Sequence, residues 1–433
     1  MSGRTRATAG HVARLDNGLR VVVDPESTVP SVCVAVVYGA GTRSERRDQV
    51  GLAHLVEHLM FQGSTGVGPG EHARLVERTG GVFNAVTRSD DTVYHQVVPP
   101  GALRQVLFCE ADRMRGLRVT EQHLRREIEV IAGEFQSTVN NVPYGAFPRS
   151  ALKALLFDRF ANTHHGYEDM ARLAETTVGD VERFLHDHYV PGNAVVAVAG
   201  QVDPEEALTL TDAYFGDIPA ATSAPRIDAA EPEPARSRHG EQHDPLAPFP
   251  AVAAAWRVPD PIHDLEAFLP YVVLAELLVG GRAPLSQRLV HDDGVAVAVD
   301  AAANLVGDPF GVRDPTGFCV AAYLRPGTDA ARVLAAVDRE FHSVADVGPG
   351  PDELVRARGR LTARLAGRLD EVSARAVWAA RFALQRNEPT FGGKLLRRLS
   401  SVDEDDVRAA AASLRSRPRA TVELTTEATA WTA

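Results

Sequence analysis

The 433-residue sequence has only three cysteines, few aromatic residues and no excess of basic residues. Cys33, Cys109 and Cys319 are scattered and form no CxxC pair, which argues against a disulfide framework or a cysteine-built metal site. They are expected to be buried small side chains in a reducing compartment. The 46 Lys and Arg against 57 Asp and Glu give a net charge of −11, so no nucleic-acid partner is expected.

Membrane and nucleotide signals are also missing. No apolar run reaches the roughly 18 residues that would suggest a membrane span. The first 18 residues contain no apolar signal segment, so no membrane partner and a cytoplasmic location are expected. The glycine pair in residues 279–285 lacks the lysine and spacing of a phosphate loop, and the absence of GxSxG argues against a serine hydrolase.

The chain is too long for one typical core, which predicts two or more domains. Residues 219–249 are rich in proline, alanine and charge and have no periodicity, as is typical of a linker. The predicted organisation is a first domain at 1–220, a linker at 221–248 and a second domain at 249–433.

The second half repeats the pattern of the first. Residues 316–341 read as strand, Pro-Gly turn and helix, as do residues 91–114. The helix predicted at 352–369 matches the one that starts near His123. A repeat of this length predicts an α+β fold of two similar units of about 200 residues each.

The strongest local signal is the run His54-Leu55-Val56-Glu57-His58, inside a segment with helical spacing. Residues four apart share one face of a helix, so both imidazoles can reach one ion. This is the HxxEH arrangement, the reverse of HExxH. Zinc in hydrolases commonly takes three protein ligands and leaves one position for water. The pattern therefore predicts a zinc site with His54 and His58 as ligands and Glu57 as the group that activates water.

The third ligand must come from another segment. Glu134 lies on the helix predicted at 121–137 and is assigned as this ligand. Glu127 lies about two turns earlier on the same face and is assigned as a catalytic-site partner that orients a ligand. The alternative is that His54 and His58 are ordinary core or surface residues, but it leaves the two acidic residues unexplained.

The chain resembles the pitrilysin, or insulysin, family of metallopeptidases, in particular the short-chain branch that includes the mitochondrial processing peptidase. The resemblance rests on the segments GLAHLVEHLMFQGS (51–64), GGVFNAVTRSDDTVYHQVV (80–98) and REIEVIAGE (126–134). It implies two α/β-sandwich units forming half of a clamshell, with short or unfolded peptides as substrates. It also implies that Asn84 and Ala85 run beside the bound peptide, which would pair with a strand edge.

The second half resembles the family more faintly. Complete members carry an Arg and a Tyr near the segment that matches 280–299. Here Val297 falls at the Tyr position and Arg288 is shifted from the Arg position. Ala357 and Arg364 match the two acidic residues of the metal site, and neither can ligate a metal. The resemblance therefore implies the zinc subunit of a heterodimer whose homologous partner supplies the Arg/Tyr pair.

Two alternatives stay open. In the first, the chain is a non-catalytic assembly subunit of a peptidase-like complex. In the second, it is a homodimeric peptidase in which Arg288 replaces the missing Arg. Leader or precursor peptides and general peptide turnover are all compatible with the sequence.

Overall fold

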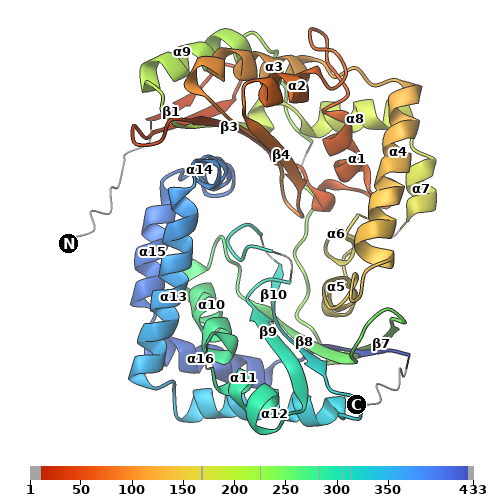
Figure 1. Ribbon diagram of the computed structural model, residues 1–433, viewed down its shortest axis with the longest axis vertical. Coiled ribbons are helices and arrows are strands. Elements are labelled where there is room, and N and C mark those ends of the chain that lie inside the picture. Colours follow the sequence, from red (N-terminus) through yellow and green to blue (C-terminus); the bar gives the residue numbers. More distant parts are fainter. Residues whose placement is uncertain are drawn as a thin grey trace. The chain divides into compact units, whose positions relative to one another are not determined.

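A computed structural model describes residues 11–166, 169–224, 226–281, 283–305, 307–313 and 315–427. The chain divides into two compact units, each assembled from separate segments (Figure 1). Unit 1 consists of Met1–Ile131, Gly166–Ile227 and Leu365–Leu396, and unit 2 of Ala132–His165, Asp228–Arg364 and Arg397–Ala433. Each half of the chain therefore contributes one segment to the unit built mainly by the other half.

Unit 1 contains a six-stranded sheet with the order β1-β2-β6-β3-β5-β4. Parallel pairing joins β2 to β6, and the other neighbours are antiparallel. The strands are β1 (His11–Arg14), β2 (Arg20–Pro25), β3 (Val32–Tyr38), β4 (Val82–Thr87), β5 (Thr92–Val98) and β6 (Ala194–Gly200).

The central strand β3 is buried along its whole length. Successive side chains of a strand point to opposite faces. Val34 and Val36 accordingly lie in a core with helices on one face, whereas Cys33 and Ala35 lie in a second core on the other face. This explains why the strand reads as a continuous apolar run rather than an alternating one.

Unit 1 has seven helices besides α14 in the described residues. They are α1 (Leu52–Leu59), α2 (Glu71–Arg78), α3 (Leu103–Arg115), α4 (Glu121–Phe135), α7 (Met170–Ala174), α8 (Val178–His188) and α9 (Pro204–Phe215). The second face is covered by α14 (Val372–Arg386), which presents the small side chains of Ala376, Ala379, Ala380 and Ala383 to the sheet. Small residues allow a helix to approach a sheet closely, which suits this sandwich.

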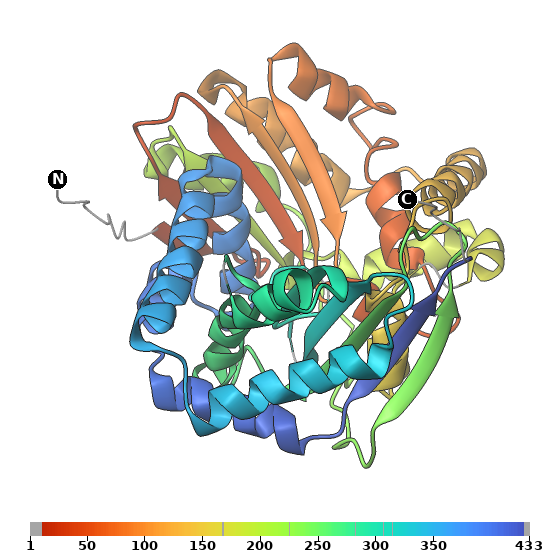
Figure 2. The ribbon, with the colours of Figure 1, turned by 60° about the horizontal axis from the view of Figure 1, so that its bottom comes forward.

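Unit 2 has a five-stranded sheet with the order β7-β11-β8-β10-β9, seen from another side in Figure 2. Its strands are β7 (Arg238–His243), β8 (Ala251–Val258), β9 (Ala296–Ala302), β10 (Thr316–Leu324) and β11 (Ala420–Thr425). Its helices are α5 (Arg149–Leu156), α6 (Phe160–Thr163), α10 (Leu265–Val279), α11 (Pro284–Ser286), α12 (Ala330–Asp346), α13 (Pro351–Asp370), α15 (Phe391–Ser401) and α16 (Glu404–Ser416), of which α13 and α15 cross the division between the units.

The two sheets have the same plan. Strands β2-β6-β3-β5-β4 correspond in order to β7-β11-β8-β10-β9, with one parallel pair followed by three antiparallel pairs in each. Helices α8 and α16 both begin with a capping box, at Thr177 and Asp403. The predicted α+β fold of two similar units is confirmed.

Two features bear on expectations from the sequence. Within the predicted linker at 221–248, Arg238–His243 form β7, which pairs in parallel with β11. Its side chains are polar and half exposed, so pairing rather than hydrophobic pattern makes it a strand.

In the described residues, the helical stretch Leu265–Asp292 is long and apolar enough to cross a membrane, with a mean hydropathy of 1.4. Because 76% of its most apolar window is buried, it is typical of a core helix.

Candidate metal centre

Helix α1 carries the HxxEH run and is fixed at both ends of its first turn. Gly51, at φ +85°, occupies the N-cap in a left-handed conformation that favours glycine. The fully buried carboxylate of Glu45 accepts hydrogen bonds from the backbone N–H of Gly51 at 3.0 Å and of Ala53 at 2.8 Å. A carboxylate at a helix N-terminus satisfies free donors and complements the helix dipole.

The apolar face of α1 orients its polar residues. Leu52, Leu55 and Leu59 are buried in the main core of unit 1. His54 and His58 therefore project together from the other side, with ring centroids 4.8 Å apart and planes at 88°. Burial, with the neighbouring His58, lowers the pKa of His54 to about 4, which keeps this imidazole neutral near pH 7. A neutral imidazole is the form that binds a metal.

Glu134 reaches the two imidazoles from α4. This helix is continuous across the division between the units, which falls just after Ile131. Leu124 and Ile131 are buried in the core of unit 1 and hold the helix there. Side-chain ligand atoms of His54, His58 and Glu134 all lie within 4.8 Å of one another. Among the described residues, this is the only group of His, Cys, Asp and Glu that could hold a metal ion.

Glu127 supports His58 from the same helix. Its Oε2 lies 3.2 Å from Nδ1 of His58, and its side chain is 7% exposed. A carboxylate that accepts the Nδ1–H proton of an imidazole fixes the tautomer and leaves Nε2 to face an ion. The donor set of two imidazoles and one carboxylate, with a carboxylate behind one imidazole, fits zinc well.

Glu57 lies between the two histidines in sequence and beside a buried tyrosine cluster. The Tyr94 and Tyr189 hydroxyl groups are 3.2 Å apart. Burial raises the pKa of Tyr189 to about 12, and the charge of Glu57 acts in the same direction. These phenols therefore stay protonated near pH 7.

Asn84 and Ala85 lie on β4, the edge strand of the first sheet. The Asn84 residue is exposed, and its Oδ1 accepts a hydrogen bond from the N–H of Ala85 at 2.9 Å. Helix α1 contacts this strand. An edge strand presents one row of backbone donors and acceptors for pairing with an extended peptide.

The corresponding residues of the second half hold no such cluster. Ala357 is fully buried, and Arg364 donates to Glu276 of α10. Val297 lies on β9. Arg288 has its Nη1 4.0 Å from Oε2 of the buried Glu340, so that its charge is already balanced.

Sequence reasoning missed Glu45 and the tyrosine cluster. Glu45 lies in a turn nine residues before His54, and its sequence context is indistinguishable from a surface carboxylate. Tyr94 lies in a strand that was predicted, but its hydroxyl partner comes from residue 189. Only long-range packing brings these groups close to α1.

Two family models match the chain. Residues 20–166 match the family model described as Insulinase (Peptidase family M16), and residues 176–361 match that described as Peptidase M16 inactive domain. Together the two matches define the class of the protein as a zinc peptidase with two homologous domains. The chain belongs to peptidase family M16.

Several curated proteins are similar. Zinc protease PqqE of Helicobacter pylori is 29% identical over 64% of this chain and 63% of its own length. A probable mitochondrial-processing peptidase subunit beta of Arabidopsis thaliana is 28% identical over 58% and 48%. The match thus spans less than two thirds of either relative. An uncharacterized zinc protease of Streptomyces coelicolor is 26% identical over 93% of this chain and 86% of its own.

Solved structures share the fold. A protease from Helicobacter pylori superimposes with a TM-score of 0.87 at 22% identity and covers 96% of this chain and 99% of its own. The periplasmic protease PqqL from Escherichia coli gives a TM-score of 0.77 at 18% identity, and this chain covers 47% of it.

Proposed function

We propose that this chain is a zinc-dependent endopeptidase that hydrolyses short or unfolded peptides. The observation that carries the proposal is the convergence of His54, His58 and Glu134, with ligand atoms within 4.8 Å of one another. His54 and His58 come from one helix and Glu134 from another, and each helix is anchored in the core of unit 1. The names of the similar zinc proteases support the same chemistry.

Each residue of the site has a separate role in the proposed reaction. When bound, zinc polarises the scissile carbonyl and makes water more acidic. Glu57 accepts the proton of the attacking water and delivers it to the leaving amine. Glu127 holds His58 in one tautomer. The substrate backbone pairs with β4 along Asn84 and Ala85, which orients the scissile bond.

Replacing Glu57 by Gln tests the proposal, because the amide cannot take up the proton. The variant is expected to bind one zinc ion per chain but to lose cleavage of an unfolded test peptide by at least about a hundredfold. Glu77→Gln, which changes an exposed residue of α2, is the matched control and should cleave normally. Normal cleavage by Glu57→Gln would refute the assignment of the base.

We also propose that the active form pairs this chain with a homologous subunit that supplies an Arg/Tyr pair. The support is that Val297 stands at the Tyr position and that Arg288 already faces Glu340. One relative is itself named as a subunit of a processing peptidase. The isolated chain should be weakly active, and full activity of the purified chain as a monomer would refute this. Absence of zinc after purification in zinc-containing buffer would favour the non-catalytic alternative.

A further inference from the structure

The repeat places two helices of unit 2 where unit 1 has its metal-binding helices. Helix α10 follows β8 as α1 follows β3, and α13 follows α12 as α4 follows α3. Helices α1 and α4 bring two imidazoles and a carboxylate together. In unit 2 the corresponding helices bring a carboxylate and two guanidinium groups together.

Glu276, near the end of α10, is 7% exposed. Its two carboxylate oxygens accept hydrogen bonds from Arg360 and Arg364 of α13. The positive charge that faces the Glu276 carboxylate is thus supplied by arginine side chains of the chain itself, and no metal ion is needed there. Two guanidinium groups against one carboxylate leave an excess of positive charge at this end of α10.

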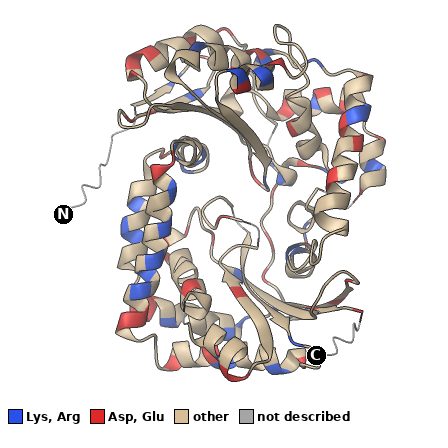
Figure 3. Ribbon diagram, in the orientation of Figure 1, with Lys and Arg blue, Asp and Glu red and all other residues tan. Residues whose placement is uncertain are grey.

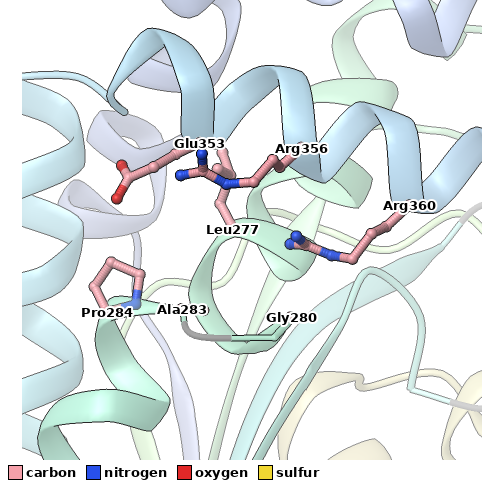
Figure 4. Close-up of a pocket in the computed structure, with 7 residues that line it drawn as sticks. All are labelled: Leu277, Gly280, Ala283, Pro284, Glu353, Arg356 and Arg360. Carbon is pink, nitrogen blue, oxygen red and sulfur yellow. The ribbon is translucent and has the colours of Figure 1, made fainter.

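A cavity of about 300 Å³ lies beside this ion-paired group. Figure 4 shows Glu353, Arg356 and Arg360 coming from α13, with Gly280 at the end of α10 and Pro284 at the start of α11. The remaining lining is apolar. The cavity therefore combines a shaped apolar wall with charged groups on one side, which is typical of a binding site.

The charge of this wall is positive. Arg356, Arg360 and Arg364 recur every four residues and share one face of α13, where Figure 3 shows repeated basic positions. Arg360 and Arg364 pair with Glu276, whereas among the described residues no ion pair involves Arg356. Glu353 is engaged with its own helix start, since it accepts the N–H of Gly350 at 3.0 Å. Of the residues that line the cavity, Arg356 and Arg360 are cationic and Glu353 is the single carboxylate.

We infer that this cavity binds an oxyanion, either a carboxylate of an acidic peptide or free phosphate, through Arg356 and Arg360. Guanidinium groups bind both by paired, charge-assisted hydrogen bonds. The site is separate from the metal centre and goes beyond the proposed peptidase activity. The small volume admits one side chain or one small anion, and the net charge disfavours cationic ligands.

Binding of a tetraglutamate peptide with a neutral coumarin label tests the inference by fluorescence anisotropy. The zinc-loaded full chain carrying Glu57→Gln is used, so that the probe is not cleaved. Adding Arg356→Glu should weaken binding at least about tenfold, since a charge-assisted contact is lost and a repulsive charge is added. Arg356→Gln should give a smaller loss in the same direction. Arg339→Glu, the same charge change on an exposed position of α12, should leave binding unaltered.

The other arms separate the sources of the anion. A tetraglutamine amide with the same label should not bind. Phosphate that displaces the peptide at a concentration near that of the peptide identifies a general oxyanion site, whereas weak displacement identifies a peptide carboxylate site. Arg356 is exposed, so both variants should melt at the unaltered temperature. Absence of binding, or binding that Arg356→Glu leaves unaltered, would overturn the inference.

Discussion

Replacing Glu127 offers the sharpest test of how the metal centre is built. Its carboxylate lies 3.2 Å from Nδ1 of His58 and is 7% exposed, so that solvent screens the interaction little. The Glu127→Gln side chain retains an oxygen that can accept the same hydrogen bond but carries no charge. Glu127→Ala removes the acceptor altogether and leaves the His58 N–H without it.

The expected magnitude follows from this geometry. Loss of a carboxylate behind a metal-binding imidazole typically costs about 10–100-fold in metal affinity. Because the amide keeps the hydrogen bond, Glu127→Gln should lie near the lower end of that range, about tenfold or about 1.4 kcal/mol. Glu127→Ala should lie near the upper end.

Zinc affinity is measured by competition with a chromophoric chelator at fixed pH and ionic strength. Glu129→Gln, which changes an exposed carboxylate two residues along α4, controls for the altered charge of the helix. If both substitutions of Glu127 leave zinc affinity within twofold of the parent chain, the orienting role of this carboxylate is refuted. An equal loss in the Glu129→Gln control would show a long-range charge effect instead.

Three further predictions concern stability. Glu45→Gln should lower the free energy of unfolding by about 1–3 kcal/mol, because a charged acceptor of two buried N–H groups is lost. The midpoint of thermal unfolding should fall, and an unaltered midpoint would contradict the capping role. Asp91→Ala should cost about 3–5 kcal/mol, because it removes a fully buried carboxylate that accepts a hydrogen bond from the buried Arg381 guanidinium. Urea unfolding measures this cost, and a loss below about 1 kcal/mol would refute it. Burial lowers the pKa of His72 from 6.5 to about 3, so its neutral form is favoured in the folded chain. Its contribution is therefore complete above pH 6.5 and is lost as pH falls toward 3, and His72→Gln should flatten the acid limb of a stability profile; an equally steep limb would refute this.

Much of the fold could be predicted from the sequence. The helix predicted at 121–137 appears in the structure as Glu121–Phe135, and the strand and helix predicted within 316–341 appear as Thr316–Leu324 and Ala330–Asp346. The helices bury one face, which gives a clear helical period, and the strand is a continuous apolar run because it is buried on both faces. Strand β7 was not predicted, because its side chains are polar and its pairing with residue 420 onward is a long-range event.

Reciprocal exchange of segments was beyond sequence reasoning. Residues 365–396 pack in unit 1 and residues 132–165 pack in unit 2. The alanine face of α14 is compatible with any closely packed surface, and nothing local names the sheet it covers. The partners of Glu276 could not be predicted either. An acidic residue in an apolar helix indicates that some cation pairs with it, but the sequence does not show that the cations are arginines of α13.

The sequence by itself determined that His54 and His58 share one helical face with Glu57 between them, since a period of 3.6 residues requires it. It also determined that Glu127 and Glu134 share a face of a second helix. Only the tertiary structure decided that the two faces meet, because the distance between helices separated by more than 60 residues depends on packing in a common core. The same packing placed guanidinium groups, rather than a metal site, at the corresponding position of the second unit.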